Sequence, residues 1–206
     1  MQNTREGLLI VLSGPSGVGK GTVLKALLER NPNMKLSISA TTRAPRPNET
    51  DGVDYFFKTH EEFNRMIEAG EFLEYMNVFN TNFYGTPRAY VDEEIAQGND
   101  IILEIDVKGA MSIKKERPDT VMIFIAPPSM STLKSRLYGR GTETAEAVER
   151  RFQEAFSEIQ CVDKYDYIVV NDILDRAVAL VEGIIASEKC KVSRNKAIID
   201  SFSEDA

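Results

Sequence analysis

The chain has 206 residues, 42% of them hydrophobic, and its 32 acidic side chains outnumber its 25 basic ones, for a net charge of −7. This size predicts one domain with a full core, and the acidic balance argues against a protein that coats a nucleic-acid polymer. No run approaches the roughly 18 apolar residues of a membrane span. Residues 1–7 lack a signal-peptide pattern, so we expect a cytoplasmic protein without a membrane segment.

The first predicted elements are a strand, a glycine-rich loop and a helix. Residues 8–13 form a short apolar run typical of a buried strand, and the apolar positions of residues 23–28 recur at helical spacing. Residues 35–41 alternate weakly, which predicts another strand. Residues 43–54 are rich in proline and charged side chains, which favours a loop.

Local capping and turn signals mark the elements that follow. Thr59 with Glu62 three residues later is a capping-box pattern, and it predicts a helix that runs to about residue 70. Residues 72–84 mix aromatic and polar side chains in a strand-like way. Thr86 followed by proline predicts an N-cap and the first residue of a helix that ends near residue 98.

The second half of the chain predicts three strands separated by helices. Residues 101–105, 121–126 and 167–170 read as buried strands, and Ser129 can cap a helix that residues 139–144 interrupt before a further helix follows. Another helix should begin near residue 172. The polar end, from about residue 191, is predicted to fray. Alternation of strands and helices predicts an α/β fold with a parallel sheet covered on both faces, into which a small α/β lobe is inserted after residue 35.

The glycine-rich loop carries the clearest chemical motif. Residues 14–20 fit the first seven positions of the pattern GxxxxGK followed by Ser or Thr, between a predicted strand and a predicted helix. Such a loop turns its backbone N–H groups toward phosphate oxygens, and its lysine reaches the β- and γ-phosphates. The motif predicts nucleoside triphosphate binding by Gly14, Pro15, Ser16, Gly17, Val18, Gly19, Lys20, Gly21 and Thr22.

The eighth position of this motif departs from the pattern. Gly21 stands where a Ser or Thr hydroxyl would contact Mg²⁺, and Thr22 follows it. Either Thr22 takes over this contact, or Mg²⁺ is held through water. The motif itself does not select a reaction.

A second anion site is predicted on the loop after the second predicted strand. Arg43 and Arg46 lie three residues apart on a proline-stiffened segment and could fork onto one phosphate, with Tyr55 and Tyr84 as O–H donors. A solvated basic loop is an equal alternative from this stretch alone. The phosphate loop earlier in the chain favours the anion site.

Seven segments, in order, resemble the guanylate kinase family. They are SISATTRAPR (37–46), DGVDYFF (51–57), EFLEY (71–75), FYGT (83–86), LEIDVKGA (103–110), FIAPPS (124–129) and RGTET (140–144), and together they span most of residues 8–190. The resemblance implies a P-loop three-layer α/β core with a parallel sheet, an inserted small GMP-binding lobe and a short helical lid. It also implies the reaction ATP + GMP to ADP + GDP, with dGMP as a further acceptor and Mg²⁺ bound with ATP.

The resemblance implies a GMP site, and the chemistry of the residues fits guanine. Glu74 can accept hydrogen bonds from N1–H and N2–H₂, Thr86 can donate to O6, and Asp106 can accept the other N2 hydrogen. Adenine would instead place a lone pair opposite the carboxylate, and such sites reject the wrong partner by roughly 10⁴-fold or more. The residues matched to the GMP phosphate are Ser39, Arg43, Arg46, Tyr55 and Tyr84.

The resemblance also assigns residues around the transferred phosphoryl group. Arg136, Arg140 and Arg151 match family arginines that surround it, and Asn171 matches a position near the ATP adenine. Glu104 ends an apolar strand and is assigned to a contact with Mg²⁺ through water. No general base is required, because the acceptor phosphate has a second pKa of about 6 and is mostly deprotonated at neutral pH.

The predicted organisation is one guanylate kinase-like domain. Its parts are a core (1–35, 87–135 and 160–190), a GMP-binding lobe (36–86), a lid (136–159) and a polar tail (191–206). Two alternatives remain beside the enzyme: a non-catalytic module that binds phosphopeptides at the GMP site, and a P-loop kinase for another small phosphorylated acceptor. Lys20 and the lid arginines argue against the first, and Glu74 with Thr86 argues against the second. The oligomeric state is left open.

Overall fold

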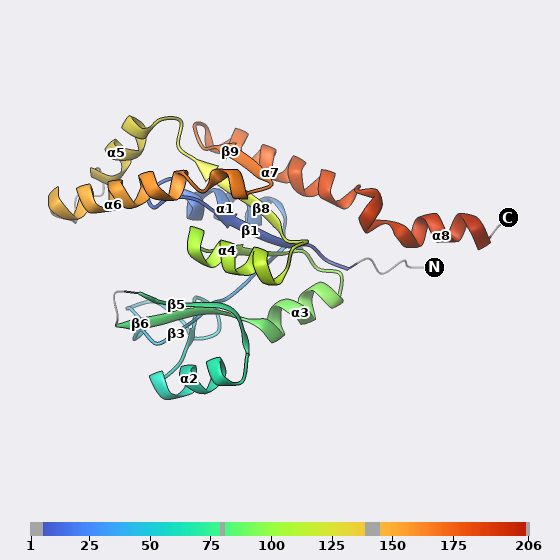
Figure 1. Cartoon of the computed structure of the whole chain (residues 1–206), viewed down its shortest axis with the longest axis horizontal. Helices are drawn as coiled ribbons and strands as arrows, with labels where there is room; N and C mark the ends of the chain where they lie inside the picture. Colours follow the sequence, from blue (N-terminus) through green and yellow to red (C-terminus); the bar gives the residue numbers. More distant parts are fainter. Residues whose placement is uncertain (1–5, 79–80, 139–144, 205–206) are drawn as a thin grey trace.

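The computed structural model describes residues 6–78, 81–138 and 145–204, and within them two sheets are surrounded by helices (Figure 1). The larger sheet has five parallel strands in the order β2-β7-β1-β8-β9. Their bounds are β1 Leu9–Ser13, β2 Lys35–Leu36, β7 Ile101–Glu104, β8 Val121–Ala126 and β9 Tyr167–Val170. This sheet confirms the predicted α/β class.

The central strands are apolar on both faces because helices cover both sides of the sheet. Every residue of β1 and β8 is buried, as expected for a parallel sheet with two covered faces. Ile10 and Leu12 pack with helices α1 and α7, while Leu9 and Val11 pack with α3 and α4. These helices are α1 Lys20–Arg30, α3 Arg88–Ala96, α4 Val107–Glu116 and α7 Leu174–Lys189.

A smaller lobe lies below the core in Figure 1 and is built on a second sheet in the order β4-β3-β6-β5. Its elements are β3 Ala40–Thr41, β4 Phe56–Phe57, α2 His60–Glu68, β5 Phe72–Val78 and β6 Asn82–Pro87. The ring of Phe63, from α2, stacks on Phe72 and Phe83 with centroid distances of 4.4 and 5.4 Å. This aromatic stack ties the helix to the sheet.

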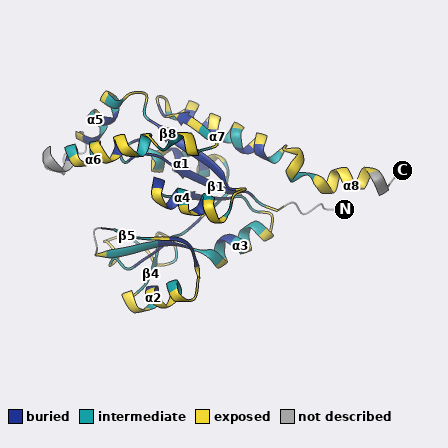
Figure 2. Ribbon diagram, viewed as in Figure 1, coloured by how far each residue is buried: buried dark blue, intermediate teal, exposed yellow. Residues whose placement is uncertain are grey.

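The remaining helices follow β8 and β9. They are α5 Met130–Tyr138, α6 Ala145–Ile159, the 3₁₀ turns η1 Val162–Lys164 and η2 Val192–Arg194, and α8 Lys196–Glu204. Helices α5 and α6 pack against each other, and α8 extends away from the body with an exposed surface (Figure 2). In the described ranges, no helix has the length and apolar character required to cross a membrane.

Four predicted boundaries are wrong or missed. Residues 35–41 form two strands, β2 and β3, that belong to different sheets. Thr86 is not an N-cap, because β6 continues to Pro87 and α3 begins one residue later. Helix α4, capped by Asp106, had not been predicted. The tail does not fray from residue 191, because η2 and α8 continue the helical structure.

The capping box at the start of α2 is confirmed and gives a stability prediction. The Thr59 hydroxyl accepts the Glu62 N–H at 3.1 Å, and the Glu62 carboxylate accepts the Thr59 N–H at 2.8 Å. We expect Thr59→Ala to lower the free energy of unfolding by about 1 kcal/mol, since one helix-terminal N–H loses its partner. Urea denaturation measures the change. Thr59→Ser keeps the hydroxyl, so a loss of equal size in that variant would contradict the prediction.

Candidate active site

The phosphate loop connects β1 to α1 in a conformation that requires glycine. Gly14, Gly17 and Gly19 have φ values of 143°, 85° and 95°, in the region that side chains disfavour. A Cβ at Gly14 would also lie 2.3 Å from the Ile125 carbonyl oxygen. The turn therefore gathers backbone N–H groups at the start of α1, where the helix dipole adds positive charge.

Lys20, the first residue of α1, folds back over this loop. Its Nζ donates to the carbonyl oxygens of Gly14 at 2.6 Å and Pro15 at 3.2 Å. The ammonium group therefore lies at the rim of the loop, where a bound phosphate chain would need a cation.

Two predicted lid arginines contact the phosphate loop. Arg136, from α5, donates to the carbonyl oxygens of Val18 at 3.1 Å and Asn171 at 2.9 Å. Asn171 is buried and donates to the same Val18 oxygen at 2.9 Å. Arg151, from α6, donates to the Ser16 hydroxyl at 2.5 Å. Arg140, also predicted for this site, lies outside the described residues.

A residue that sequence reasoning missed reaches the same loop. Glu158 of α6 is half-buried, and burial raises the pKa of its carboxyl group, while the Lys20 ammonium and the Ser16 amide act in the opposite direction. Glu158 follows Arg151 by seven residues, or about two helical turns, so both lie on one face of α6. That spacing was a readable signal in the sequence.

The two arginines predicted to bind the phosphate of the acceptor nucleotide, Arg43 and Arg46, differ in their surroundings. Arg43 donates to Glu49 and Tyr84, and its guanidinium lies over the Tyr55 ring, 5.3 Å from the centroid. The side chain of Arg46 is exposed and makes no hydrogen bond or ion pair with any other residue that the structure describes. Glu49 is not among the predicted site residues, although its spacing of three from Arg46 is typical of a turn contact.

Tyr55, Tyr84 and Ser39 border the same loop. The rings of Tyr55 and Tyr84 meet edge to face, with centroids 6.0 Å apart. Burial raises the pKa of Tyr55, so its hydroxyl stays protonated as a donor. Ser39 is half-buried beside them, and its carbonyl oxygen accepts the Phe56 N–H at 2.9 Å.

The predicted purine-reading carboxylate is buried at the junction of the lobe and the core. Glu74 is 8% exposed, and its Oε1 accepts the Thr86 hydroxyl at 2.8 Å across the β5–β6 pair. Burial raises the pKa of Glu74 from 4.5 to about 7; Thr86 opposes this rise, and nearby Asp106 adds to it. Asp106 itself accepts the Gly109 N–H at 2.8 Å and so caps α4.

The sheet places Glu104 and Asp106 at the same end of the parallel strands as the phosphate loop. β1 pairs with β7 so that Leu12 lies opposite Glu104, and the chain then continues to the loop on one strand and to Asp106 on the other. Burial raises the pKa of the Glu104 carboxyl group, which the Lys20 ammonium partly opposes. The phosphate loop and Asp106 therefore follow the ends of two neighbouring strands, β1 and β7.

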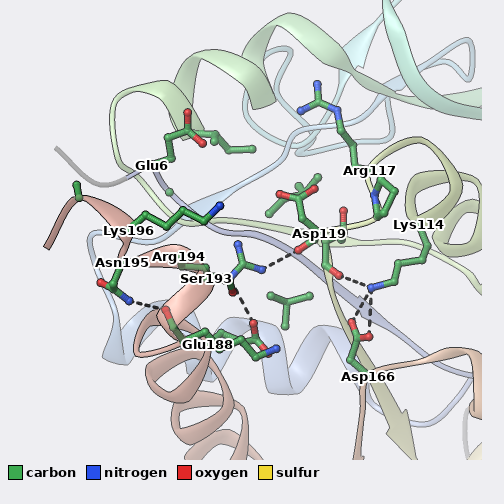
Figure 3. Close-up of a pocket in the computed structure, with 18 of the residues that line it drawn as sticks. Glu6, Lys114, Arg117, Asp119, Asp166, Glu188, Ser193, Arg194, Asn195 and Lys196 are labelled. Atoms are coloured by element: carbon green, nitrogen blue, oxygen red, sulfur yellow. Dashed lines mark hydrogen bonds and ion pairs between the residues drawn. The ribbon is translucent and has the colours of Figure 1, made fainter. Parts of the chain in front are cut away.

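The opposite end of the sheet contains a cavity of about 860 Å³ (Figure 3). Some of its charged groups pair with one another: Lys114 contacts Asp166 at 2.9 Å, and Arg194 contacts Glu188 at 3.4 Å. None of the predicted site residues lines this cavity. It is separate from the candidate active site.

A phosphate loop on a parallel sheet, with an arginine loop and a buried carboxylate in an inserted lobe, is the arrangement of a P-loop nucleoside monophosphate kinase. The guanylate kinase family model matches residues 6–188, and the chain belongs to the guanylate kinase family. The guanylate kinase of Caldanaerobacter subterraneus subsp. tengcongensis is 50% identical over 206 residues, covering 100% of both chains. That of Clostridioides difficile is 52% identical over 202 residues, covering 98% of each. The crystal structure of guanylate kinase from Anaplasma phagocytophilum has a TM-score of 0.74 and 35% identity, covering 92% of this chain and 90% of that chain.

Proposed function

We propose that this protein transfers the γ-phosphoryl group of ATP to GMP, giving ADP and GDP, and that dGMP is a further acceptor. The curated guanylate kinases that are about 50% identical along the whole chain support this reaction. The observation that carries it is the buried Glu74–Thr86 pair, which offers a carboxylate to a purine in a protein with an intact phosphate loop. We propose that it acts in the cytoplasm on these small nucleotides, with no nucleic-acid polymer as partner.

On the donor side, the loop from Gly14 to Thr22 would bind the ATP phosphates through backbone N–H groups. Lys20 would exchange its two carbonyl partners for the β- and γ-phosphate oxygens, since an ammonium binds a phosphate more strongly than a neutral carbonyl. Asn171, fixed against Val18, would border the adenine. The phosphate chain is thus held by groups that are already in place.

The residues present fit a magnesium ion that is held mainly by the nucleotide. A Cβ at Gly21 would lie 3.6 Å from both Glu104 carboxylate oxygens, so this carboxylate faces the first turn of α1, beside the predicted phosphate site. Within the described ranges, no three acidic, His or Cys side chains gather as a metal cage. Mg²⁺ bound with ATP takes most of its ligands from phosphates and water. Glu104 would hold it through water, with Thr22 as the alternative. Bound there, Mg²⁺ would neutralise charge on the β- and γ-phosphates.

On the acceptor side, one set of polar side chains would bind the phosphate of GMP and another would bind its guanine base. Arg43, Arg46, Tyr55, Tyr84 and Ser39 would bind the GMP phosphate, and Glu74, Thr86 and Asp106 would read guanine. Glu74 would accept from N1–H and N2–H₂, while the Thr86 hydroxyl would turn from Glu74 toward O6. A carboxylate at this depth is costly to leave unpaired, so the guanine edge is favoured over adenine.

Transfer would depend on positioning and charge rather than on covalent help. Arg136 and Arg151 already border the loop, and with Arg140 they would surround the transferred group. We propose that the lobe (36–86) and the lid (136–159) close on the core when both nucleotides bind, which excludes water.

A coupled assay tests this function directly. With ATP and Mg²⁺, we expect turnover with GMP and dGMP, and much lower kcat/KM with AMP, CMP or UMP. Good turnover with one of those three and none with GMP would overturn the proposal. Binding of GMP without any turnover would favour a non-catalytic module.

The raised pKa of Glu74 predicts that GMP affinity depends on pH. Only the ionised carboxylate accepts two N–H groups from guanine, so we expect the affinity for GMP to rise with pH through about 7. The free protein should show the opposite trend, because a raised carboxyl pKa stabilises the fold at low pH and this contribution is lost between 4.5 and about 7. Calorimetry of GMP binding between pH 5.5 and 8.5 measures the first trend, and thermal unfolding the second.

Glu74→Gln provides the control for this pH profile. The GMP phosphate also titrates, near a pKa of about 6, so one inflection should remain in the variant while the upper one disappears. An unchanged profile in the variant would show that Glu74 does not titrate in this range.

A further inference from the structure

The guanidinium group of Arg43 has most of its donors engaged. Arg43 Nη2 donates to Glu49 Oε1 at 2.9 Å, and Nη1 lies 2.9 Å from Oε2, so the carboxylate faces the end of the guanidinium. Nη1 also donates to the Ala44 carbonyl at 2.7 Å, and Nε donates to the Tyr84 hydroxyl at 3.2 Å. A guanidinium has five N–H groups and two edges that can bind an anion in a fork, one at its end and one at its side.

Glu49 also fixes the backbone that carries both arginines. Its Oε2 accepts the Arg46 N–H at 2.7 Å, and its own N–H donates to the Arg46 carbonyl at 3.1 Å. Asn48, between them, has a φ of 74°, a left-handed turn conformation that asparagine adopts more readily than most residues. The carboxylate therefore determines both the orientation of one guanidinium and the fold of the loop.

The Arg43–Glu49 pair is shielded from solvent. The two side chains are only 14% and 16% exposed, so water screens their attraction less than it would at an open surface. The hydrogen bond between them raises the pKa of Arg43 and lowers that of Glu49, which keeps both groups charged at neutral pH. The Tyr55 and Phe57 rings lie 5.3 and 5.9 Å from the guanidinium carbon and limit its tilt.

The edge that remains for a ligand is the side edge, Nε with Nη2. Its present partner is the hydroxyl of Tyr84, a neutral group that can rotate away far more easily than a paired carboxylate. Tyr84 is itself one of the residues expected at the acceptor phosphate. The side edge of Arg43 therefore faces a residue that is itself expected to contact the acceptor phosphate.

We propose that Glu49 is a positioning residue for the acceptor phosphate: it grips the end of the Arg43 guanidinium so that the side edge faces the phosphate. This inference rests on the proposed role of Arg43 in GMP binding and adds a residue to it. Glu49 does not touch the nucleotide. It lowers the ordering that Arg43 must undergo on binding, which is how preorganisation raises affinity.

Charge and geometry predict opposite effects for Glu49→Gln. Loss of a negative charge near the phosphate would, by Coulomb attraction alone, strengthen GMP binding. Loss of one of the two carboxylate oxygens of Glu49 would weaken GMP binding, because the amide offers only one acceptor oxygen to Arg43 and Arg46. We expect the KM for GMP to rise about five- to twentyfold, with kcat and the KM for ATP changed by less than about twofold.

A double-mutant cycle separates positioning from general loosening of the loop. Arg43→Lys cannot present a forked edge, so Glu49→Gln should add less than about twofold to the KM for GMP in that background. Glu68→Gln, at the exposed end of α2, removes the same charge from the lobe and should leave the KM for GMP unchanged. Glu49→Asp keeps the charge but is too short for both contacts, and it should give an intermediate KM.

Each possible result either supports or overturns the positioning role of Glu49. A raised KM for GMP in Glu49→Gln that vanishes in the Arg43→Lys background supports the inference. A KM that is unchanged or lower, or a rise of the same size in both backgrounds, overturns it. If the unmutated protein does not bind GMP in calorimetry, the proposed function fails instead, so the two failures are distinguishable.

Discussion

Replacement of Lys20 by methionine should reduce kcat/KM by about 10³-fold or more while the protein stays folded. Phosphoryl transfer gains most of its rate from fixed charges around the transferred group. Lys20 is the cation at the rim of the phosphate loop, held there by the carbonyl oxygens of Gly14 and Pro15. Methionine has a similar length and no charge, so the loop should keep its shape while the γ-phosphoryl loses a cation. Steady-state kinetics with ATP and GMP measure the effect.

The exposed Lys25 provides a matched control for this variant. It lies on α1 one turn and a half beyond Lys20 and faces solvent. Lys25→Met changes the net charge equally and should leave kcat/KM within about twofold, as expected for a surface substitution. A thermal midpoint for Lys20→Met close to that of the unmutated protein would show that the loss is chemical. Activity of Lys20→Met within tenfold of the unmutated protein would contradict the assigned role.

Local sequence patterns predicted those parts of the fold that local physics determines. The capping box at Thr59 requires only four residues, and the structure has both of its hydrogen bonds. Strands β1, β7 and β8 were predicted because a parallel sheet covered on both faces needs continuous apolar runs. In each case the signal and the structure involve the same short segment of chain.

Boundaries that depend on distant partners could not be predicted in this way. Residues 35–41 divide between two sheets because residues 35–36 pair with β7, while residues 40–41 pair with β4 and β6. No feature within the segment itself shows which residue changes sheet. Thr86 stays in β6 because Glu74, opposite it on β5, accepts its hydroxyl, and this tertiary bond outweighs the preference of threonine for an N-cap.

The candidate site was predicted as a set of ligand contacts, and the structure adds contacts within the protein. Arg136 and Arg151 were predicted near a phosphoryl group, and they already bond to the loop through Val18 and Ser16. Glu49 and Glu158 were missed because a carboxylate beside an arginine patch reads as ordinary surface charge. Their spacing from Arg46 and Arg151 indicates a shared turn or helix face, but only the fold shows that Glu49 pairs with Arg43 and that Glu158 lies at the phosphate loop.

Replacement of Glu74 by glutamine should weaken the preference of the site for guanine over adenine. The amide group replaces one acceptor oxygen with an NH₂ donor, which would face the N1–H and N2–H₂ donors of guanine. Adenine in the same orientation places its N1 acceptor opposite the NH₂ group of glutamine, while its N6 amino group lies where O6 of guanine would meet Thr86. We expect kcat/KM for GMP to fall about 10²-fold or more and kcat/KM for AMP to rise. With GMP, a buried donor of the glutamine faces a donor of guanine, and an unpaired buried donor lowers the binding free energy.

The stability of this variant should change in the other direction, which separates recognition from folding. Glu74 is buried, and its carboxyl pKa is raised to about 7, so above neutral pH the fold carries the cost of a desolvated charge. Glutamine has the same shape and can still accept the Thr86 hydroxyl, so at pH 8 we expect a thermal midpoint equal to or higher than that of the unmutated protein. Glu71→Gln, at an exposed position three residues earlier, should change neither quantity. A Glu74→Gln variant that keeps full kcat/KM for GMP would remove Glu74 from the purine site, whereas one that loses both activity and stability would give it a structural role.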